Sequence, residues 1–168
     1  AVGTGGGNGM GRSICKAYAA AGAQVVVADI RLTAAQAVTD EICAAGGKAI
    51  AAQADVSKKS QVEALMKTAY DTFRAIDVLC NNAGIIVKKL VEEMDETDWD
   101  MTMNVNAKGV FLCSQAVLPY MKRQGGGRII STASVSGKVG FEQESAYCAS
   151  KAAVILYTRA LALETAED

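Results

Sequence analysis

The feature that most constrains the fold is an alternation of short β-branched runs with longer amphipathic stretches. The runs are too short and too rich in valine and isoleucine for helices, so they predict strands at 24–29, 48–55, 76–82 and 127–133. The opening AVGT reads as the tail of a further strand that precedes them. The stretches between and after them predict helices over 10–21, 33–45, 58–73, 98–123 and 145–165. Repeated βα units imply an α/β fold, in which helices cover both faces of a parallel sheet.

Breaker and capping residues agree with most of these boundaries. Glycine pairs or triplets follow two of the predicted helices, at 46–47 and 125–127. Ser60 and Glu63 have the spacing of a capping box, whereas Pro119 argues against an uninterrupted helix over 98–123. We find no linker or low-complexity segment, and 168 residues suffice for one core. Residues 1–168 are therefore predicted to form a single domain.

Composition disfavours several classes of protein. Net charge is −1 without a basic run, which argues against nucleic-acid binding, and no apolar run is long enough to cross a bilayer. The five cysteines are scattered, odd in number and without a CxxC pair. This pattern indicates neither a disulfide framework nor a zinc site, and it favours reduced thiols in a cytoplasmic protein.

The opening GTGGGNGMGRSI, residues 3–14, joins the first strand to the first helix. Its glycines fit T-G-x-x-x-G-x-G, with Thr4, Gly5, Gly9 and Gly11. Glycines at such a turn let the backbone approach a pyrophosphate at the helix N-terminus, although a flexible turn explains them equally well. Context supports the first interpretation, because Asp29 ends the second strand 20 residues after Gly9.

Asp29 also bears on the choice of cofactor. Its carboxylate can accept hydrogen bonds from the adenosine ribose of NAD and would repel the 2′-phosphate of NADP. Arg31, two residues further on, would weaken that repulsion. The sequence thus favours NAD, with NADP the less favoured cofactor.

A tyrosine and a lysine in SAYCASK, residues 145–151, suggest proton transfer in a chain that has no histidine. Tyr147 and Lys151 are four residues apart and share one face of the predicted helix. A nearby ammonium and a positively charged nicotinamide would both stabilise a tyrosinate. The alternative is a surface lysine beside a core tyrosine.

Together these motifs resemble the short-chain dehydrogenase/reductase family in its compact, single-domain branch. The matching segments are TGGGNGMG (4–11), NNAG (81–84), VNAKG (105–109) and YCASK (147–151), with a serine thirteen residues before the tyrosine. Gly3 departs from the pattern, because the family usually has an apolar or β-branched residue there. The resemblance implies a Rossmann-type, doubly wound sheet in three α/β/α layers. It also implies NAD(P)-dependent oxidation and reduction at CH–OH groups, with no metal.

The resemblance assigns four catalytic residues, Asn106, Ser134, Tyr147 and Lys151. Ser134 would bond to the substrate oxygen, Tyr147 would transfer the proton and Lys151 would also reach the nicotinamide ribose. Asn106 would hold a helix distortion and a water that links the lysine to solvent. By residue type alone Ser131 and Ser136 rival Ser134, and Asn104 rivals Asn106. Asn81 is expected to brace the central strand.

The predicted cofactor-binding residues come from five segments of the chain. Asp55 and Val56 would lie along the adenine, although Asp55 can instead be a helix-entry residue before Ser57. The full set is Thr4, Gly5, Asn8, Gly9, Met10, Gly11, Asp29, Ile30, Asp55, Val56, Asn82, Ala83, Gly84, Tyr147 and Lys151.

The leading functional hypothesis is hydride transfer between NAD(H) and a secondary alcohol or ketone. Glu142, Gln143 and Glu144 suggest a small diol, polyol or sugar as substrate, but they read equally well as solvated loop residues. One alternative is an NADPH-dependent 3-oxoacyl-thioester reductase, against which Asp29 argues. The other is a non-catalytic, cofactor-binding regulatory module, which would not need the four catalytic residues.

Two further expectations concern the surface and the extent of the chain. Segments 110–121 and 146–163 are apolar almost all round, and family members pair these helices, so we expect a homo-oligomer, either a dimer or a homotetramer. Burial beneath further chain is the alternative. Family members usually continue through two more strands and a helical substrate lid, so this chain is expected to be incomplete.

Overall fold

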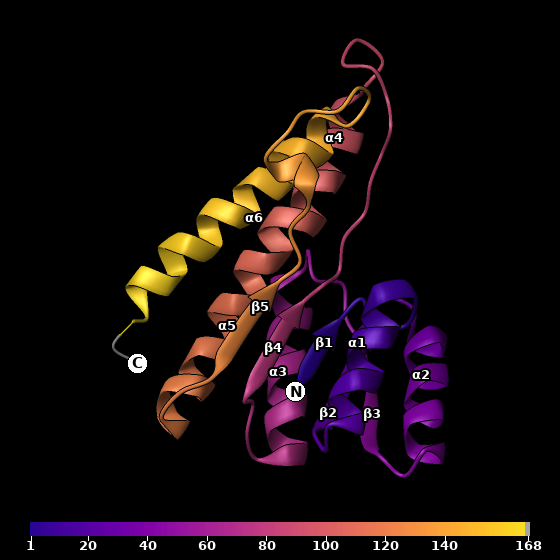
Figure 1. Ribbon diagram of the computed structural model, residues 1–168, viewed down its shortest axis with the longest axis vertical. Helices are drawn as coiled ribbons and strands as arrows, with labels where there is room; N and C mark the ends of the chain where they lie inside the picture. The colour runs from indigo at the N-terminus through magenta and orange to yellow at the C-terminus, as the bar shows by residue number, and fades with distance from the viewer. Residues whose placement is uncertain (167–168) are drawn as a thin grey trace.

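A parallel five-stranded sheet forms the centre of the computed structural model, which describes residues 1–166 (Figure 1). Its strand order is β3-β2-β1-β4-β5, and every neighbouring pair is parallel. The strands are β1 (Val2–Thr4), β2 (Gln24–Asp29), β3 (Lys48–Gln53), β4 (Val78–Asn81) and β5 (Arg128–Ser131). The chain builds outward from β1 in one direction, then crosses to β4 and continues in the other. This confirms the doubly wound Rossmann-type fold, in which ligands bind where the strand order reverses.

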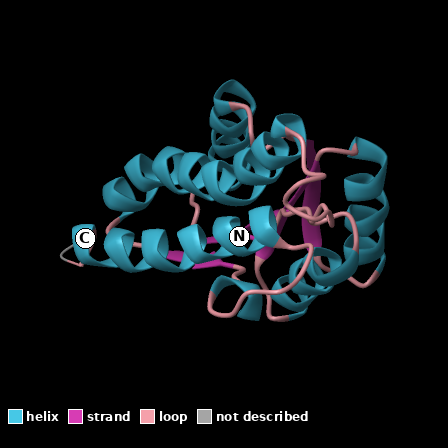
Figure 2. Cartoon of the chain, turned by 90° about the horizontal axis from the view of Figure 1, so that it is seen from above, coloured by secondary structure: helices cyan, strands magenta, loops and turns pink. Residues whose placement is uncertain are grey.

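Helices flank the sheet (Figure 2). They are α1 (Gly9–Ala20), α2 (Leu32–Ala44), α3 (Lys59–Phe73), α4 (Glu96–Met103), α5 (Gly109–Gln124) and α6 (Ser145–Glu164). Alternate residues of β2 point to opposite faces: Val25 and Val27 pack with α1 and α2, whereas Val26 packs with α3 and α5. Since both faces of β2 are covered, its sequence is a continuous apolar run and does not alternate.

The helix predicted over 98–123 is divided into three parts. A π-helical segment, Asn104–Lys108, separates α4 from α5. Such a segment places one extra residue in the turn and often marks a functional site. Pro119 lies inside α5 and does not end it; α5 ends at Gly125, whose φ of 88° is left-handed.

The predicted capping box of Ser60 and Glu63 is wrong. Helix α3 begins at Lys59, so Ser60 is already inside it, and the N-cap residue Lys58 makes no side-chain cap. The chain before the helix is held instead by Gln61, whose side-chain oxygen accepts a hydrogen bond from the Asp55 N–H (2.8 Å).

Gly3 is accounted for by a packing contact between β1 and α1. A Cβ atom at Gly3 would lie 2.6 Å from Sγ of the buried Cys15. The Cys15 side chain therefore fills the space that an apolar residue at position 3 would need. Burial in this core raises the pKa of the Cys15 thiol to about 12, with a smaller contribution from Cys80.

The sheet is less well covered at β5 than at β2. Ile130, in the middle of β5, is 48% exposed, whereas the valines of β2 are fully buried. Within residues 1–166 no helix is both long and apolar enough to cross a membrane.

Candidate active site

A cleft of about 450 Å³ opens at the carboxyl ends of the central strands. All of the predicted cofactor-binding residues except Thr4, Tyr147 and Lys151 line it. Arg31, Ala54, Ile85 and Val105 also line the cleft but were not among the predicted cofactor-binding residues. Val105 begins the VNAKG motif, and the other three directly precede or follow predicted residues, which is the sequence signal that could have found them.

The glycine-rich loop forms one wall of the cleft at the start of α1. Gly5 has a φ of 60°, and a Cβ atom at Gly11 would lie only 2.0 Å from the Gly5 carbonyl oxygen. The Asn8 side chain caps α1 by accepting a hydrogen bond from the Gly9 N–H (2.8 Å). A Cβ at Gly9 would meet nothing within 4 Å, so the helix N-terminus is open to the cleft. This arrangement suits a pyrophosphate, because the partial positive charge of the helix end favours an anion.

Thr4 lies beneath the cleft and ties β1 to the end of β4. Its hydroxyl oxygen accepts hydrogen bonds from the N–H groups of Asn82 and Ala83 (both 3.1 Å) and donates to the Cys80 carbonyl (3.3 Å). The Asn82 side chain donates in return to the Thr4 carbonyl (3.2 Å). Thr4 is therefore placed to position the cleft residues and is not itself part of the lining.

The Asp29 carboxylate is held at the end of β2 by two backbone groups. Oδ2 accepts from the Gly7 N–H and Oδ1 from the Arg31 N–H, each at 3.0 Å. The Arg31 guanidinium is near, with Nε 3.9 Å from Oδ1, and most of that side chain is exposed. Because a carboxylate oxygen has two lone pairs, both oxygens keep capacity to accept from ribose hydroxyls.

The position of Asp55 is compatible with both interpretations that its sequence position left open. It lines the cleft. Its Oδ1 also accepts from the N–H (2.9 Å) and the hydroxyl (2.7 Å) of Ser57, in the turn that leads into α3.

Lys151 connects the catalytic helix to the cleft. It is buried on α6, its Nζ donates to the Thr132 carbonyl (2.7 Å), and it lies 5.6 Å from the centre of the Tyr147 ring. A Cβ atom at Gly84, which lines the cleft, would be 3.6 Å from the same Nζ. Burial lowers the pKa of Lys151. The structure thus brings the Lys151 ammonium close to both the Tyr147 ring and the edge of the cleft.

Ser134 stands in the loop after β5, at the N-cap of a short 3₁₀ helix, Val135–Gly137. Its Oγ accepts a hydrogen bond from the Ser136 N–H (3.1 Å). This short helix is packed tightly on α6, because a Cβ at Gly137 would lie 2.7 Å from the carbonyl carbon of Lys151.

The two rival serines are engaged elsewhere. The Ser131 hydroxyl accepts from the Asn81 side chain (3.5 Å), and the buried Ser136 hydroxyl donates to Glu144 (3.1 Å). Asn81 also donates to the Ser114 hydroxyl on α5 (3.2 Å), which braces β4 as expected. The bond to Glu144 occupies the Ser136 proton, which disfavours Ser136 as the donor to a substrate, whereas Ser131 and Ser134 each accept a hydrogen bond and keep their proton free.

Asn106 is fully buried in the π-helical segment and joins the cleft to α6. Its Oδ1 accepts from the Ile85 N–H, and its Nδ2 donates to the Ile85 carbonyl, both at 2.8 Å. Nδ2 also donates to the Ser150 hydroxyl (3.0 Å), one residue before Lys151. These contacts favour Asn106 over Asn104.

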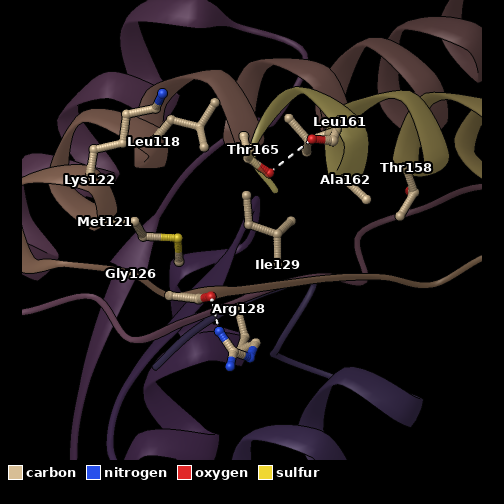
Figure 3. A pocket seen from close by; sticks show the side chains of 11 residues that line it. Leu118, Met121, Lys122, Gly126, Arg128, Ile129, Thr158, Leu161, Ala162 and Thr165 are labelled. Atoms are coloured by element: carbon tan, nitrogen blue, oxygen red, sulfur yellow. Dashed lines mark hydrogen bonds between the residues drawn. The ribbon is translucent and has the colours of Figure 1, made fainter. Parts of the chain in front are cut away.

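A second cavity, of about 170 Å³, lies between α5, β5 and the C-terminal part of α6 (Figure 3). Apolar side chains such as Leu118, Ile129 and Leu161 surround it, and none of the predicted site residues lines it. Two of its polar side chains are turned to nearby backbone: the Thr165 hydroxyl donates to the Leu161 carbonyl (2.9 Å) and Arg128 donates to the Gly127 carbonyl (2.8 Å). The buried Thr158 hydroxyl, which also lines the cavity, has no hydrogen-bond partner among residues 1–166. We therefore place the candidate active site at the first cleft.

The comparisons with known proteins agree with this geometry. The family model "short chain dehydrogenase" matches residues 1–168. The chain belongs to the short-chain dehydrogenase/reductase family. The four motifs that carry the family resemblance contribute to this cleft or lie beside it. They are residues 4–11, 81–84, 105–109 and 147–151.

Named relatives differ in their substrates. The chain is 45% identical over 164 residues to 3-oxoacyl-[acyl-carrier-protein] reductase of Synechocystis sp., covering 97% of this chain and 66% of that protein. It is 40% identical over 165 residues to cyclohexanol dehydrogenase of Acinetobacter sp., covering 98% and 66%. A solved short-chain dehydrogenase/reductase from Burkholderia phymatum, in complex with NAD, matches with a TM-score of 0.94 at 33% identity, covering 97% of this chain and 58% of that one. The chain thus spans about two thirds or less of the length of these relatives.

Proposed function

We propose that this short-chain dehydrogenase/reductase transfers a hydride between NAD(H) and a secondary alcohol or its ketone. The observation that carries the proposal is the position of the Lys151 ammonium, beside the Tyr147 ring and next to Gly84 in the cleft. A dinucleotide fits the cleft because Gly5 and Gly11 leave room for a backbone cradle and α1 offers its N-terminus. Bound there, NAD would supply the hydride acceptor.

Four residues divide the remaining work. The Ser134 oxygen already accepts from the Ser136 N–H, so its own proton is free to donate to the substrate oxygen. Tyr147 acts as a tyrosinate that the Lys151 ammonium stabilises; it takes the proton of the substrate hydroxyl and becomes neutral tyrosine. Asn106 holds the Ile85 backbone against α6 and so fixes the distance between cleft and catalytic helix.

NAD is the proposed cofactor, in preference to NADP. The support is the Asp29 carboxylate, fixed by two backbone N–H groups where it would meet a 2′-phosphate. The NAD complex of the Burkholderia phymatum relative is consistent with this choice. Arg31, with its largely exposed side chain, is the group that favours NADP.

A small diol, polyol or sugar is the proposed substrate class. The polar residues Glu142 and Gln143 are exposed on the loop before α6, but Glu144 is engaged by Lys88 and Ser136. The second candidate is a 3-oxoacyl thioester reduced with NADPH, favoured by the similarity to the Synechocystis reductase. The presence of Asn106, Ser134, Tyr147 and Lys151 together argues against a purely regulatory module, which would not need this set.

A homo-oligomer, either dimeric or tetrameric, formed through α5 and α6 is also proposed. Both helices expose large apolar side chains, among them Phe111 (40%), Leu156 (64%) and Leu163 (82%). Phe111 and Tyr157 already contact each other edge to face across the two helices, at 6.2 Å between ring centres. A cytoplasmic location is proposed from the five free cysteines.

The test is a panel of secondary alcohols, polyols, sugars, ketones and 3-oxoacyl thioesters, each assayed with both nicotinamide cofactors by absorbance. We expect the highest kcat/KM for an alcohol or polyol with NAD. A preference for 3-oxoacyl thioesters with NADPH would establish the second candidate instead. Tight cofactor binding without turnover of any member would point to the regulatory module.

A further inference from the structure

Three side chains that the proposed mechanism does not use form a connected hydrogen-bond chain beside Ser134. Oε1 of Glu144 pairs with Nζ of Lys88 (2.9 Å), and Oε2 accepts from the Ser136 hydroxyl (3.1 Å). The Glu144 side chain is only 14% exposed, whereas that of Lys88 is 61% exposed. A sheltered carboxylate with two defined partners is held far more firmly than a charge on a solvated surface.

One end of this chain reaches the catalytic serine. Ser136 is buried, and its backbone N–H is the group that donates to Ser134 Oγ. A hydroxyl has one proton and two acceptor sites, so occupation of one acceptor site by this N–H restricts where the Ser134 proton can point. The orientation of Ser134 therefore depends on the position of Ser136.

The other end reaches the segment that lines the cofactor cleft. Lys88 lies four residues after Gly84, and the neighbouring Lys89 N–H donates to the Gln143 carbonyl (3.1 Å). The segment after β4 is thus attached to the loop before α6 at two adjacent points. The Glu144 carbonyl also accepts from the Cys148 N–H (2.7 Å), in the first turn of α6 next to Tyr147.

We infer that Glu144 is a positioning residue for the reaction: it orients Ser134 through Ser136, and Lys88 holds its carboxylate in place. This inference rests on the proposed function, in which Ser134 donates to the substrate oxygen. Removal of the carboxylate leaves a buried hydroxyl without its acceptor and frees the 3₁₀ turn that carries Ser134. A displacement of about 1 Å at such a donor can lower turnover by about 100-fold.

The decisive experiment compares Glu144→Leu in two backgrounds, the wild-type protein and Ser134→Ala. In the wild-type background kcat is expected to fall by about 10- to 100-fold, while the Kd for NADH changes less than about threefold. In the Ser134→Ala background the same change should have almost no further effect on kcat, because the hydroxyl that Glu144 orients is absent. Glu144→Gln keeps an acceptor for Ser136 and should recover much of the loss.

Matched controls separate this effect from a general loss of charge or fold. Lys89→Met removes the adjacent lysine, which pairs with Asp95 and Asp98, and should lower kcat less than Lys88→Met does. Glu63→Gln removes a carboxylate from an exposed pair on α3 and should leave kcat unchanged. Circular dichroism and cofactor titration verify that each variant is folded.

Two results would overturn the inference. One is an active wild-type enzyme in which Glu144→Leu keeps full kcat. The other is an equal loss of kcat from Glu144→Leu with and without Ser134, which would mean that Glu144 acts on the substrate directly. An inactive wild-type protein across the whole substrate panel would instead overturn the proposed function, so the two failures are distinguishable.

Discussion

The proposed cofactor side and the proposed catalytic side of the cleft are built in different ways. On the cofactor side, the loop between β1 and α1 presents backbone, with glycines that approach each other closely and an open helix end. On the catalytic side, the functional groups are side chains joined by bonds between distant segments, such as Asn106 to Ile85 and Lys151 to Thr132. The first arrangement is local in sequence, whereas the second depends on how three elements pack.

The packing of the sheet shows the same difference. Strand β2, which carries Asp29, has its valines fully buried between two helical layers, whereas Ile130 of β5, which leads to Ser134, is 48% exposed. The cofactor side therefore rests on a core that covers it on both faces. On the proposed catalytic side, Asn106 and Lys151 are held by individual hydrogen bonds between elements, so single substitutions there should affect geometry more than global stability.

The largest expected effect is on the catalytic side. Tyr147→Phe removes the proton-transferring hydroxyl and should lower kcat by about 1,000-fold, within the range for loss of a general acid–base group. The Kd for NADH, measured by fluorescence, should change less than about threefold because the cleft lining is untouched. Near-normal turnover of Tyr147→Phe would contradict the assignment of proton transfer to the catalytic side of the cleft.

The converse test is on the cofactor side. Gly11→Ala places a Cβ 2.0 Å from the Gly5 carbonyl oxygen, so the loop must move. We expect the Kd for NADH to rise at least about tenfold and the free energy of unfolding to fall by about 1–3 kcal/mol, the usual cost of overpacking. Cofactor titration and urea denaturation measure both. Gly140→Ala is the control, because a Cβ there would meet nothing within 4 Å.

A smaller effect is expected for cofactor discrimination. Asp29→Ala removes the carboxylate that opposes a 2′-phosphate and leaves Arg31 nearby. The preference for NAD over NADP in kcat/KM should fall by about tenfold, equivalent to about 1.4 kcal/mol. An unchanged preference would mean that other parts of the cleft make the discrimination.

The smallest change should be in stability alone. Gly3→Ala puts a Cβ 2.6 Å from Cys15 Sγ and should lower the free energy of unfolding by about 1–3 kcal/mol. Cys15→Ala in the same molecule removes the clashing sulfur and should recover part of that loss. Urea denaturation of the single and double variants measures the coupling free energy between positions 3 and 15. Strictly additive losses in the free energy of unfolding would show that the contact with Cys15 does not cause the loss in Gly3→Ala.

The sequence was most informative where function depends on a short, continuous pattern. The glycine loop at 4–11, Asp29 and the Tyr147–Lys151 pair were each found by their spacing. The alternation of strands and helices predicted a parallel sheet covered on both faces, and the family resemblance implied that it is doubly wound. The π-helical break at Asn104–Lys108 left no periodic signal, because one extra residue in a turn barely disturbs an apolar pattern. The start of α3 was predicted within one residue, but the capping box at Ser60 was wrong, because Gln61 holds the entry to that helix through Asp55.

By itself, the sequence determined the order of the elements, the glycine cradle and the identity of the residues expected to do chemistry, because each depends on neighbours within a few positions. The tertiary structure decided that Lys151 meets Gly84, that Cys15 takes the space beside Gly3 and that Glu144 links Lys88 to Ser136. These contacts join residues from 8 to 67 positions apart, and only the packing of helices on the sheet brings them together. Spacing along a chain carries no information about such distances until the fold has formed.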